Sequence, residues 1–295
     1  MAAWARLGER AVVGAEGAEV RKLLQGLVSN DLDDLAPDRP LYAALLTPQG
    51  KYLFDFLMVD RGEGLWLDAE AGRIDELVRR LLLYRLRAQA AFVRRDDLAV
   101  YAVFGEGTTL PPLPETLAGF VDPRLPALGA RVVGPPELVE PLLAEAFEAA
   151  SEAAYDAHRL ALGVPDGSRD LAPDKALLLE SGFVELNGVA FDKGCFVGQE
   201  LTARMRYRAT VRKRLLPVRL STDVEPGTPV LAGAVEVGDL HSVRNGAGLA
   251  LIRVERWRQA QADGVPLQAG AATVEPWVPD WVDLSFGAKT AASSA

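Results

Sequence analysis

The first third of the chain alternates between short strand-like runs and longer amphipathic stretches, and this order restricts the fold more than any other feature. Apolar residues recur at helical spacing across positions 20–28 and 74–82. Strand-like runs lie around these two helices, at positions 10–14, 41–46, 52–59, 65–69 and 90–94. The order β-α-β-β-β-α-β predicts helices on one face of a mainly antiparallel sheet, which is an α+β architecture.

The middle third repeats this style, and the last third changes it. Strand-like runs at 98–104 and 131–133 are followed by helical stripes at 138–147 and 155–162. From about residue 215, short β-rich runs alternate with Gly, Pro and Asn, which is typical of a small all-β barrel. A chain of 295 residues exceeds most single cores, so we expect several parts. The predicted boundaries are 1–98, 99–212 and 213–295.

Composition excludes several kinds of site. The formal net charge of −9 argues against a surface built mainly to bind nucleic acid, and we expect no such contact. The single cysteine, Cys195, excludes an internal disulfide and an iron–sulfur cluster held by this chain alone. Two histidines make a self-contained zinc site improbable, so we predict no metal site. No apolar run is long enough to cross a bilayer, and the N-terminal residues resemble neither a signal nor a transit peptide. We therefore expect a cytoplasmic protein without a membrane partner.

The most informative motif is Lys193-Gly194-Cys195-Phe196-Val197-Gly198-Gln199-Glu200. It resembles the K-G-C-[FY]-x-G-Q-E signature of the YgfZ family of folate-binding proteins. The following LTAR and the later VRKRL are similar to the mitochondrial branch of that family, which acts in [4Fe–4S] cluster assembly. The segments LQGLVSND, LLTPQGK, YRLR, R…GVP and GLALIR also fit, so the resemblance covers essentially the whole chain.

The resemblance implies the fold of the glycine-cleavage T-protein, with a folate-binding body of two ferredoxin-like units and a C-terminal β-barrel. It implies tetrahydrofolate as the cofactor, with the polyglutamylated form as one option. Asn30 lies in LQGLVSND, the segment similar to the family's LQGQVTND, and is expected to bind the cofactor. At Glu180-Ser181-Gly182 the chain departs from the Glu-Ser-Asn of the mitochondrial branch, so Gly182 offers no amide side chain to a ligand.

Cys195 allows two interpretations. A lone cysteine is commonly a buried, small apolar residue. However, Gly194 and Gly198 flank it, Lys193 stands beside it, and a helix is predicted to start near Gln199. This setting favours the thiolate, so we predict that Cys195 and Lys193 form the reactive centre.

Three carboxylates are candidates for contacting folate. Asp55 lies between Phe54 and Phe56, where it faces either solvent or a ligand. The T-protein has a catalytic aspartate at the comparable place with an acidic residue before it, where this chain has Phe54. Glu180 and Glu200 are expected to accept hydrogen bonds from the pterin edge, or else to cap helix N-termini.

The segment from 193 to 219 carries eight basic residues and one acid, Glu200. It is either a solvated barrel edge, a partner surface, an RNA contact, or a site for the anionic glutamate tail of folate. Arg206 and Arg208 are the residues expected to hold the tail, because arginine pairs with carboxylates through two hydrogen bonds.

These observations predict a tetrahydrofolate-binding accessory factor for assembly or repair of [4Fe–4S] proteins, including tRNA-modifying enzymes. Its partners would be folate and iron–sulfur assembly or client proteins. The alternative is a folate-dependent aminomethyl or one-carbon transferase, since fold alone does not settle function. The cysteine motif and the loss of the paired acids favour the accessory role without turnover.

Overall fold

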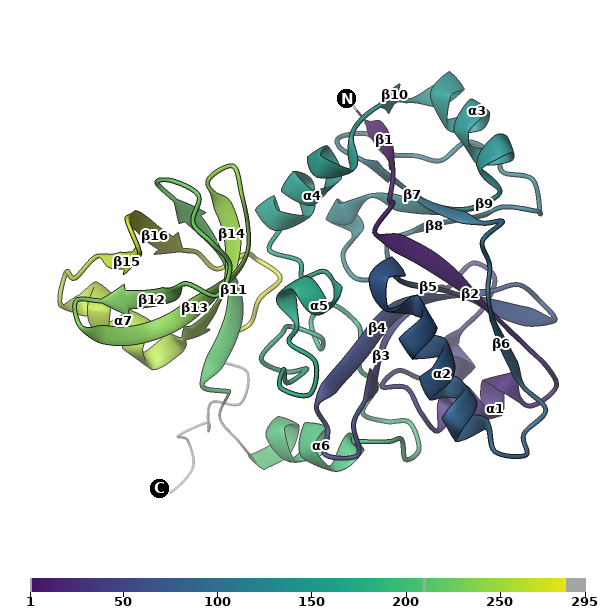
Figure 1. The fold of residues 1–295 in the computed structure, drawn as a ribbon, viewed down its shortest axis with the longest axis horizontal. Helices are drawn as coiled ribbons and strands as arrows, with labels where there is room; N and C mark the ends of the chain where they lie inside the picture. Colours follow the sequence, from purple (N-terminus) through teal and green to yellow (C-terminus); the bar gives the residue numbers. More distant parts are fainter. Residues whose placement is uncertain (1, 209–210, 285–295) are drawn as a thin grey trace, which may run out of the picture.

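The chain folds into a body of two five-stranded sheets and a separate closed barrel, seen on the left of Figure 1. The computed structural model describes residues 2–208 and 211–284, with the backbone alone described at Arg208. Within these residues no helix is long and apolar enough to span a membrane. The predicted T-protein-like body of two ferredoxin-like units and a barrel is confirmed. The boundaries 1–98, 99–212 and 213–295 remain predictions.

The first sheet has the order β3-β4-β5-β2-β6, and all its neighbouring strands are antiparallel. Its strands are β2 (Arg10–Glu16), β3 (Leu41–Leu46), β4 (Tyr52–Asp60), β5 (Gly64–Glu70) and β6 (Ala91–Arg94). Its helices are α1 (Val20–Gln25), η1 (Leu32–Asp34), η2 (Ala71–Arg73) and α2 (Ile74–Arg85). The predicted elements of this region are therefore all present, with shifts of a few residues at their ends.

Strand β4 distributes its side chains between two cores, because successive residues of a strand point to opposite faces. Phe54, Phe56 and Met58 pack into the core beneath α1 and α2. Leu57 and Val59 face the second unit and join the core shared by both sheets. Burying each such large apolar side chain contributes about 1.5–3 kcal/mol. This alternation also turns Asp55 inward, between the two units.

The second sheet has the order β10-β1-β7-β9-β8, and the sequence analysis did not predict β1, β8 or β10. Its strands are β1 (Ala3–Arg6), β7 (Ala99–Phe104), β8 (Ala118–Val121), β9 (Ala130–Gly134) and β10 (Glu148–Ala149). Its helices are η3 (Pro126–Leu128), α3 (Pro136–Ala146) and α4 (Glu152–Ala161). Because β1 pairs antiparallel with β7, the N-terminus belongs to the second sheet although β2 belongs to the first.

A long segment then runs back across the first unit before the barrel begins. It contains α5 (Gly167–Asp170) and ends in α6 (Gln199–Arg208), the helix predicted after the cysteine motif. Leu178, Phe183 and Leu186 of this segment fill the core between the sheets. The segment thereby brings the cysteine motif to the end of the β3–β4 hairpin, and α6 lies at this end in Figure 1.

The barrel closes in the order β11-β14-β13-β12-β15-β16. Its strands are β11 (Lys213–Leu220), β12 (Pro229–Ala232), β13 (Val235–Arg244), β14 (Ala247–Arg253), β15 (Leu267–Ala269) and β16 (Ala272–Pro276). One helix, α7 (Val254–Ala262), packs against β13 and β14 and was not predicted.

Candidate functional site

The site is built on the turn that joins β3 and β4. The amide of Gly50 donates to the carbonyl oxygen of Thr47 at 2.8 Å, which closes the turn. Gly50 has φ +77°, and a Cβ there would lie 2.7 Å from Cβ of Leu201 and 2.8 Å from the carbonyl oxygen of Gly198. Only glycine fits this position without strain, because α6 and its preceding loop press against the turn.

The loop that precedes α6, residues 193–198, is fixed on two sides; we call it the cysteine loop. On one side, Nζ of Lys193 donates to the carbonyl oxygens of Val28, at 2.9 Å, and Asn30, at 2.6 Å. The amide of Val197 also donates to the carbonyl oxygen of Gly26. On the other side Gly198, with φ +83°, approaches the hairpin so closely that a Cβ would lie 2.5 Å from the carbonyl oxygen of Thr47.

Cys195 is exposed on this anchored loop. The interpretation of Cys195 as a buried apolar residue is therefore wrong. Lys193, by contrast, is only 7% exposed. Burial lowers its pKa to about 8, although the negative charges of Asp31 and Asp33 act to raise it. Two hydrogen bonds of its ammonium go to backbone carbonyls, so these contacts make Lys193 an anchor of the loop.

Asn30 connects the cysteine loop to the inner face of β3. Its side-chain Nδ2 donates to the carbonyl oxygens of Tyr42 and Asn187, both at 2.8 Å. Its Oδ1 accepts from the amide of Asp31. With its carbonyl bound by Lys193, Asn30 joins three segments, and its side chain is already occupied by the protein.

Asp55 is buried between two tyrosines and is only 3% exposed. Its carboxylate accepts hydrogen bonds from the hydroxyls of Tyr42, at 2.9 Å, and Tyr52, at 2.7 Å. Burial raises the pKa of Asp55, while the charge of Arg10 and the two hydroxyls oppose the shift. The solvent-facing alternative for Asp55 is thus wrong, and both of its oxygens have partners.

Glu180 lies where the hairpin, the long segment and the barrel meet. Its backbone carbonyl accepts from the amide of Leu215 in β11 at 2.8 Å. Burial raises the pKa of its carboxyl, and the cations of Lys213 and Lys51 oppose this rise. The half-buried carboxylate makes no hydrogen bond with any described residue. Glu180 therefore offers an acceptor that is open to a ligand, with two lysines close by.

The remaining predicted residues lie on α6. Glu200 is exposed in the first turn of the helix and pairs with Arg204 at 2.7 Å. The guanidinium of Arg206 lies 5.1 Å from the ring centre of Phe191. The side chain of Arg208 lies outside the described residues. The structure thus brings the cysteine loop to the turn of the hairpin and Glu180 near Lys51 after that turn. It ties Asn30 to Lys193 and to Tyr42 at the start of β3, and leaves Glu200 on the outer surface.

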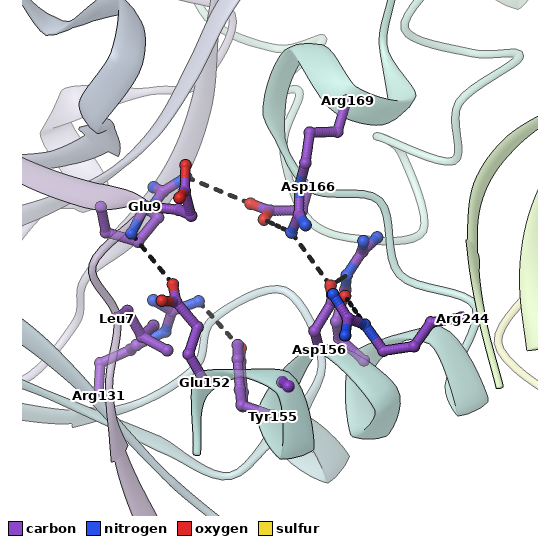
Figure 2. Close-up of a pocket in the computed structure, with 12 residues that line it drawn as sticks. Leu7, Glu9, Arg131, Glu152, Tyr155, Asp156, Asp166, Arg169 and Arg244 are labelled. Carbon is purple, nitrogen blue, oxygen red and sulfur yellow. Dashed lines mark hydrogen bonds and ion pairs between the residues drawn. The ribbon is translucent and has the colours of Figure 1, made fainter. Parts of the chain in front are cut away.

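A second feature is a charged cavity of about 450 Å³ that receives residues from both units and from the barrel. Figure 2 shows Arg169 and Arg244 directed at Asp156, with distances of 3.0 and 2.7 Å. Deeper in the cavity Arg10 pairs with Asp68 at 2.7 Å, and the positive charges of Arg10 and its neighbours lower the pKa of Asp166. None of the residues predicted for the site lines this cavity.

Comparison with known proteins decides the family. The human iron-sulfur cluster assembly factor IBA57, mitochondrial, is 33% identical over 315 residues, which cover 94% of this chain and 86% of that protein. The mouse protein of the same name is 31% identical and covers 93% and 85%. The chain belongs to the IBA57 family. The resemblance drawn from the cysteine motif is confirmed.

Two further comparisons agree with the fold. Residues 212–284 match the family described as CAF17, C-terminal beta-barrel domain. The crystal structure of the glycine cleavage system aminomethyltransferase T from Bartonella henselae has a TM-score of 0.71 at 14% identity, over 95% of this chain and 86% of that chain. This likeness concerns the fold alone.

The IBA57 relatives also correct the expected location. The human, mouse and Mycosarcoma maydis proteins are all named as mitochondrial, so the expectation of a cytoplasmic protein is wrong. That expectation came from the composition of the N-terminal residues.

Sequence reasoning missed the charged cavity of this IBA57-family chain. One signal is present in the sequence, the R…GVP segment that begins at Arg159. Arg159 forms ion pairs with Asp156, at 2.8 Å, and with Asp170. It also donates a hydrogen bond to the hydroxyl of Ser242 in the barrel at 3.1 Å. The acidic partners are scattered over distant segments, and nothing in the sequence pairs them.

Proposed function

We propose that this chain is a tetrahydrofolate-binding accessory factor for assembly or repair of [4Fe–4S] proteins, including tRNA-modifying enzymes. The observation that carries the proposal is the exposed thiol of Cys195 on an anchored loop in a member of the IBA57 family. The relatives' own names describe iron–sulfur cluster assembly factors. An exposed residue on a rigid loop suits contact with a second protein better than a buried one.

Cys195 would act on a cluster or client protein as a nucleophile, a redox group or a transient ligand. A cluster typically needs about four protein ligands, so the cluster is a substrate that is shared with a partner. The two anchors of the cysteine loop keep the thiol in place before the partner arrives. Rigid supports of this kind reduce the ordering cost of binding.

The residues near Glu180 fit folate. The carboxylate of Glu180 can accept hydrogen bonds from the amide and amino groups of a pterin, which need such acceptors. Lys51 and Lys213 can pair with the carboxylates of the tail, as an alternative to Arg206 and Arg208. Asp55 is only 3% exposed, so a ligand would reach it only if the side chains that cover it moved. When bound, tetrahydrofolate supplies a reduced ring that carries one-carbon units.

The direct test is anaerobic titration calorimetry with tetrahydrofolate in monoglutamate and polyglutamate forms. We expect binding of both and tighter binding of the polyglutamate, because additional carboxylates meet the basic residues of the site. Absence of heat and of any thermal shift with reduced folates would refute the cofactor.

A folate-dependent aminomethyl transferase remains the competing function, because the T-protein shares the fold. We expect no useful rate of methylene-tetrahydrofolate formation from a protein-bound aminomethyl donor. Asp55 is preceded by Phe54 and not by an acidic residue, and it is buried with both oxygens bonded to tyrosines, whereas general acid–base catalysis needs an accessible group. Formation of the product that is lost in Asp55→Asn would support the transferase instead.

A further inference from the structure

Helix α2 exposes leucines on the side opposite to its buried face. Ile74, Leu77 and Leu81 are buried in the core of the first unit. Leu83 is 71% exposed and Leu86, at the end of the helix, is 86% exposed. Exposed apolar groups rimmed by charge are typical of interaction sites.

The backbone at Leu86 holds this side chain outward at a cost. Leu86 follows the last helical residue and has φ +49°. Helices that end in this region usually place Gly or Asn there, because a larger side chain is strained. The protein gains no core contact from the strained leucine, and such strain is often found where a residue serves a binding function.

Four arginines surround these leucines without a carboxylate partner. Arg79 and Arg85 bond only the backbone carbonyls of Asp75 and Ala90, and Arg80 and Arg87 form no ion pair with any described residue. Neighbouring arginines behave differently, as the following pairs show: Arg73 with Glu76, Arg94 with Asp96, and Arg95 with Asp97. In a chain of net charge −9, four unpaired cations at one helix end indicate an anionic partner.

We propose that this surface docks an acidic, leucine-containing amphipathic segment of a partner protein. The α2-end surface comprises Arg79, Arg80, Leu83, Arg85, Leu86 and Arg87. Arg79 and Leu83 are four residues apart and share a helix face, and Leu86 follows directly after the last residue of the helix. The surface lies on the first unit apart from the barrel (Figure 1), and it involves neither folate nor Cys195.

The chemistry of the α2-end surface favours protein over lipid or RNA. Its cations are all arginines, whose planar guanidinium groups form paired hydrogen bonds with carboxylates. Membrane-binding helices usually insert Trp or Phe, and RNA-binding surfaces usually stack exposed aromatics on bases. Tyr84, the aromatic residue of this segment, instead packs partly against the core.

The test measures anisotropy of a short fluorescent peptide in which leucines at helical spacing are flanked by glutamates, titrated with the full chain. We expect binding that weakens with salt, and no binding of a counterpart with every Glu replaced by Lys. Leu83→Glu and Arg80→Glu should each weaken binding at least about tenfold. Val121→Glu in β8, where Val121 is 59% exposed, is the matched control and should leave binding unchanged.

Leu86→Gly separates binding from folding. Glycine relieves the positive φ, so the thermal midpoint should hold or rise while peptide binding falls. The proposal is overturned if neither peptide binds, if both bind equally, or if the variants bind like wild type. Stronger binding to vesicles of phosphatidylcholine with about 30% phosphatidylserine, or to single-stranded RNA, would equally overturn it.

Discussion

The ammonium of Lys193 donates a 2.6 Å hydrogen bond to the backbone carbonyl of Asn30, although the two residues are 163 positions apart in the chain. Asn30 in turn binds the backbone of Tyr42, whose hydroxyl bonds Asp55. One continuous set of hydrogen bonds therefore runs from the cysteine loop to the buried carboxylate of β4. These hydrogen bonds link the cysteine loop to the interior of the first unit.

Replacing Lys193 by Met should loosen the cysteine loop. The carbonyls of Val28 and Asn30 would lose their donor, and an unsatisfied buried polar group costs about 1–3 kcal/mol. Chemical denaturation should show this loss, and hydrogen exchange should accelerate in residues 193–198. The control is Lys22→Met on the exposed side of α1, which should change neither quantity. Unchanged exchange in Lys193→Met would show that the loop is held by other contacts.

The stability of the protein should depend on pH through Lys193. Its pKa is about 8 when folded and about 10.5 when unfolded, because burial disfavours the cation. Unfolding therefore takes up a proton between these values, and a rise in pH across this window disfavours unfolding. Wild type should gain free energy of unfolding relative to Lys193→Met between about pH 8 and 10.5. Parallel profiles of the two proteins would contradict the lowered pKa.

Arg159 should be a main support of the junction between α4, α5 and the barrel. Replacing it by Met leaves Asp170 buried without its charge partner, which typically costs about 3–5 kcal/mol. Arg169→Met is the control, since Arg169 is 41% exposed and its loss should cost below about 1 kcal/mol. Similar small losses in both variants, measured by urea denaturation, would mean that the network adds little to stability.

Local patterns in the sequence were enough for much of this fold. Helical spacing from Ile74 to Leu82 predicted α2, and the strand-like runs at 41–46 and 52–59 predicted β3 and β4. Strand β1 was not predicted, because its four residues show no clear alternation of buried and exposed side chains. Ala5 is the buried residue of this strand. Its place in the second sheet depends on pairing with β7, about a hundred residues away, which no local pattern encodes.

The site was predicted through the cysteine motif, and its contacts were not. Sequence placed Lys193 beside Cys195 and suggested a direct electrostatic role, whereas the ammonium is directed to Val28 and Asn30. Asp55 was expected to meet a ligand, and its tyrosine partners could not be assigned because Tyr42 comes from a different strand. The hydrogen-bond partner of each of these groups is determined by tertiary packing, because a buried polar group bonds the nearest available partner.

Glu180 should be the carboxylate that recognises folate. Glu180→Gln keeps the shape and removes one acceptor and the charge, so affinity for tetrahydrofolate should fall about tenfold or more. Glu200→Gln is the control, because Glu200 is exposed and already pairs with Arg204.

The same titrations can locate the glutamate tail. If Lys213→Gln removes the extra affinity for polyglutamate while Arg206→Glu does not, the tail lies beside Glu180. The reverse result would place it on α6. Equal affinities of Glu180→Gln and wild type for the monoglutamate would exclude Glu180 from the pterin site.

Cys195 should be required for function and dispensable for structure. Cys195→Ser replaces one atom at an exposed position, so the free energy of unfolding should change by less than about 0.5 kcal/mol, and folate affinity should stay the same. In cells that depend on this protein, the activity of [4Fe–4S] enzymes should nevertheless collapse, because serine offers neither a thiolate nor a soft ligand. Cys195→Ala serves as the matched variant and should fail equally.

Iodoacetamide should alkylate the wild-type thiol readily in the native protein, and the dependence of that rate on pH measures how far the thiolate is favoured. Full complementation by the Ser variant, together with a thiol that resists alkylation, would show that the loop acts through its shape and not through sulfur.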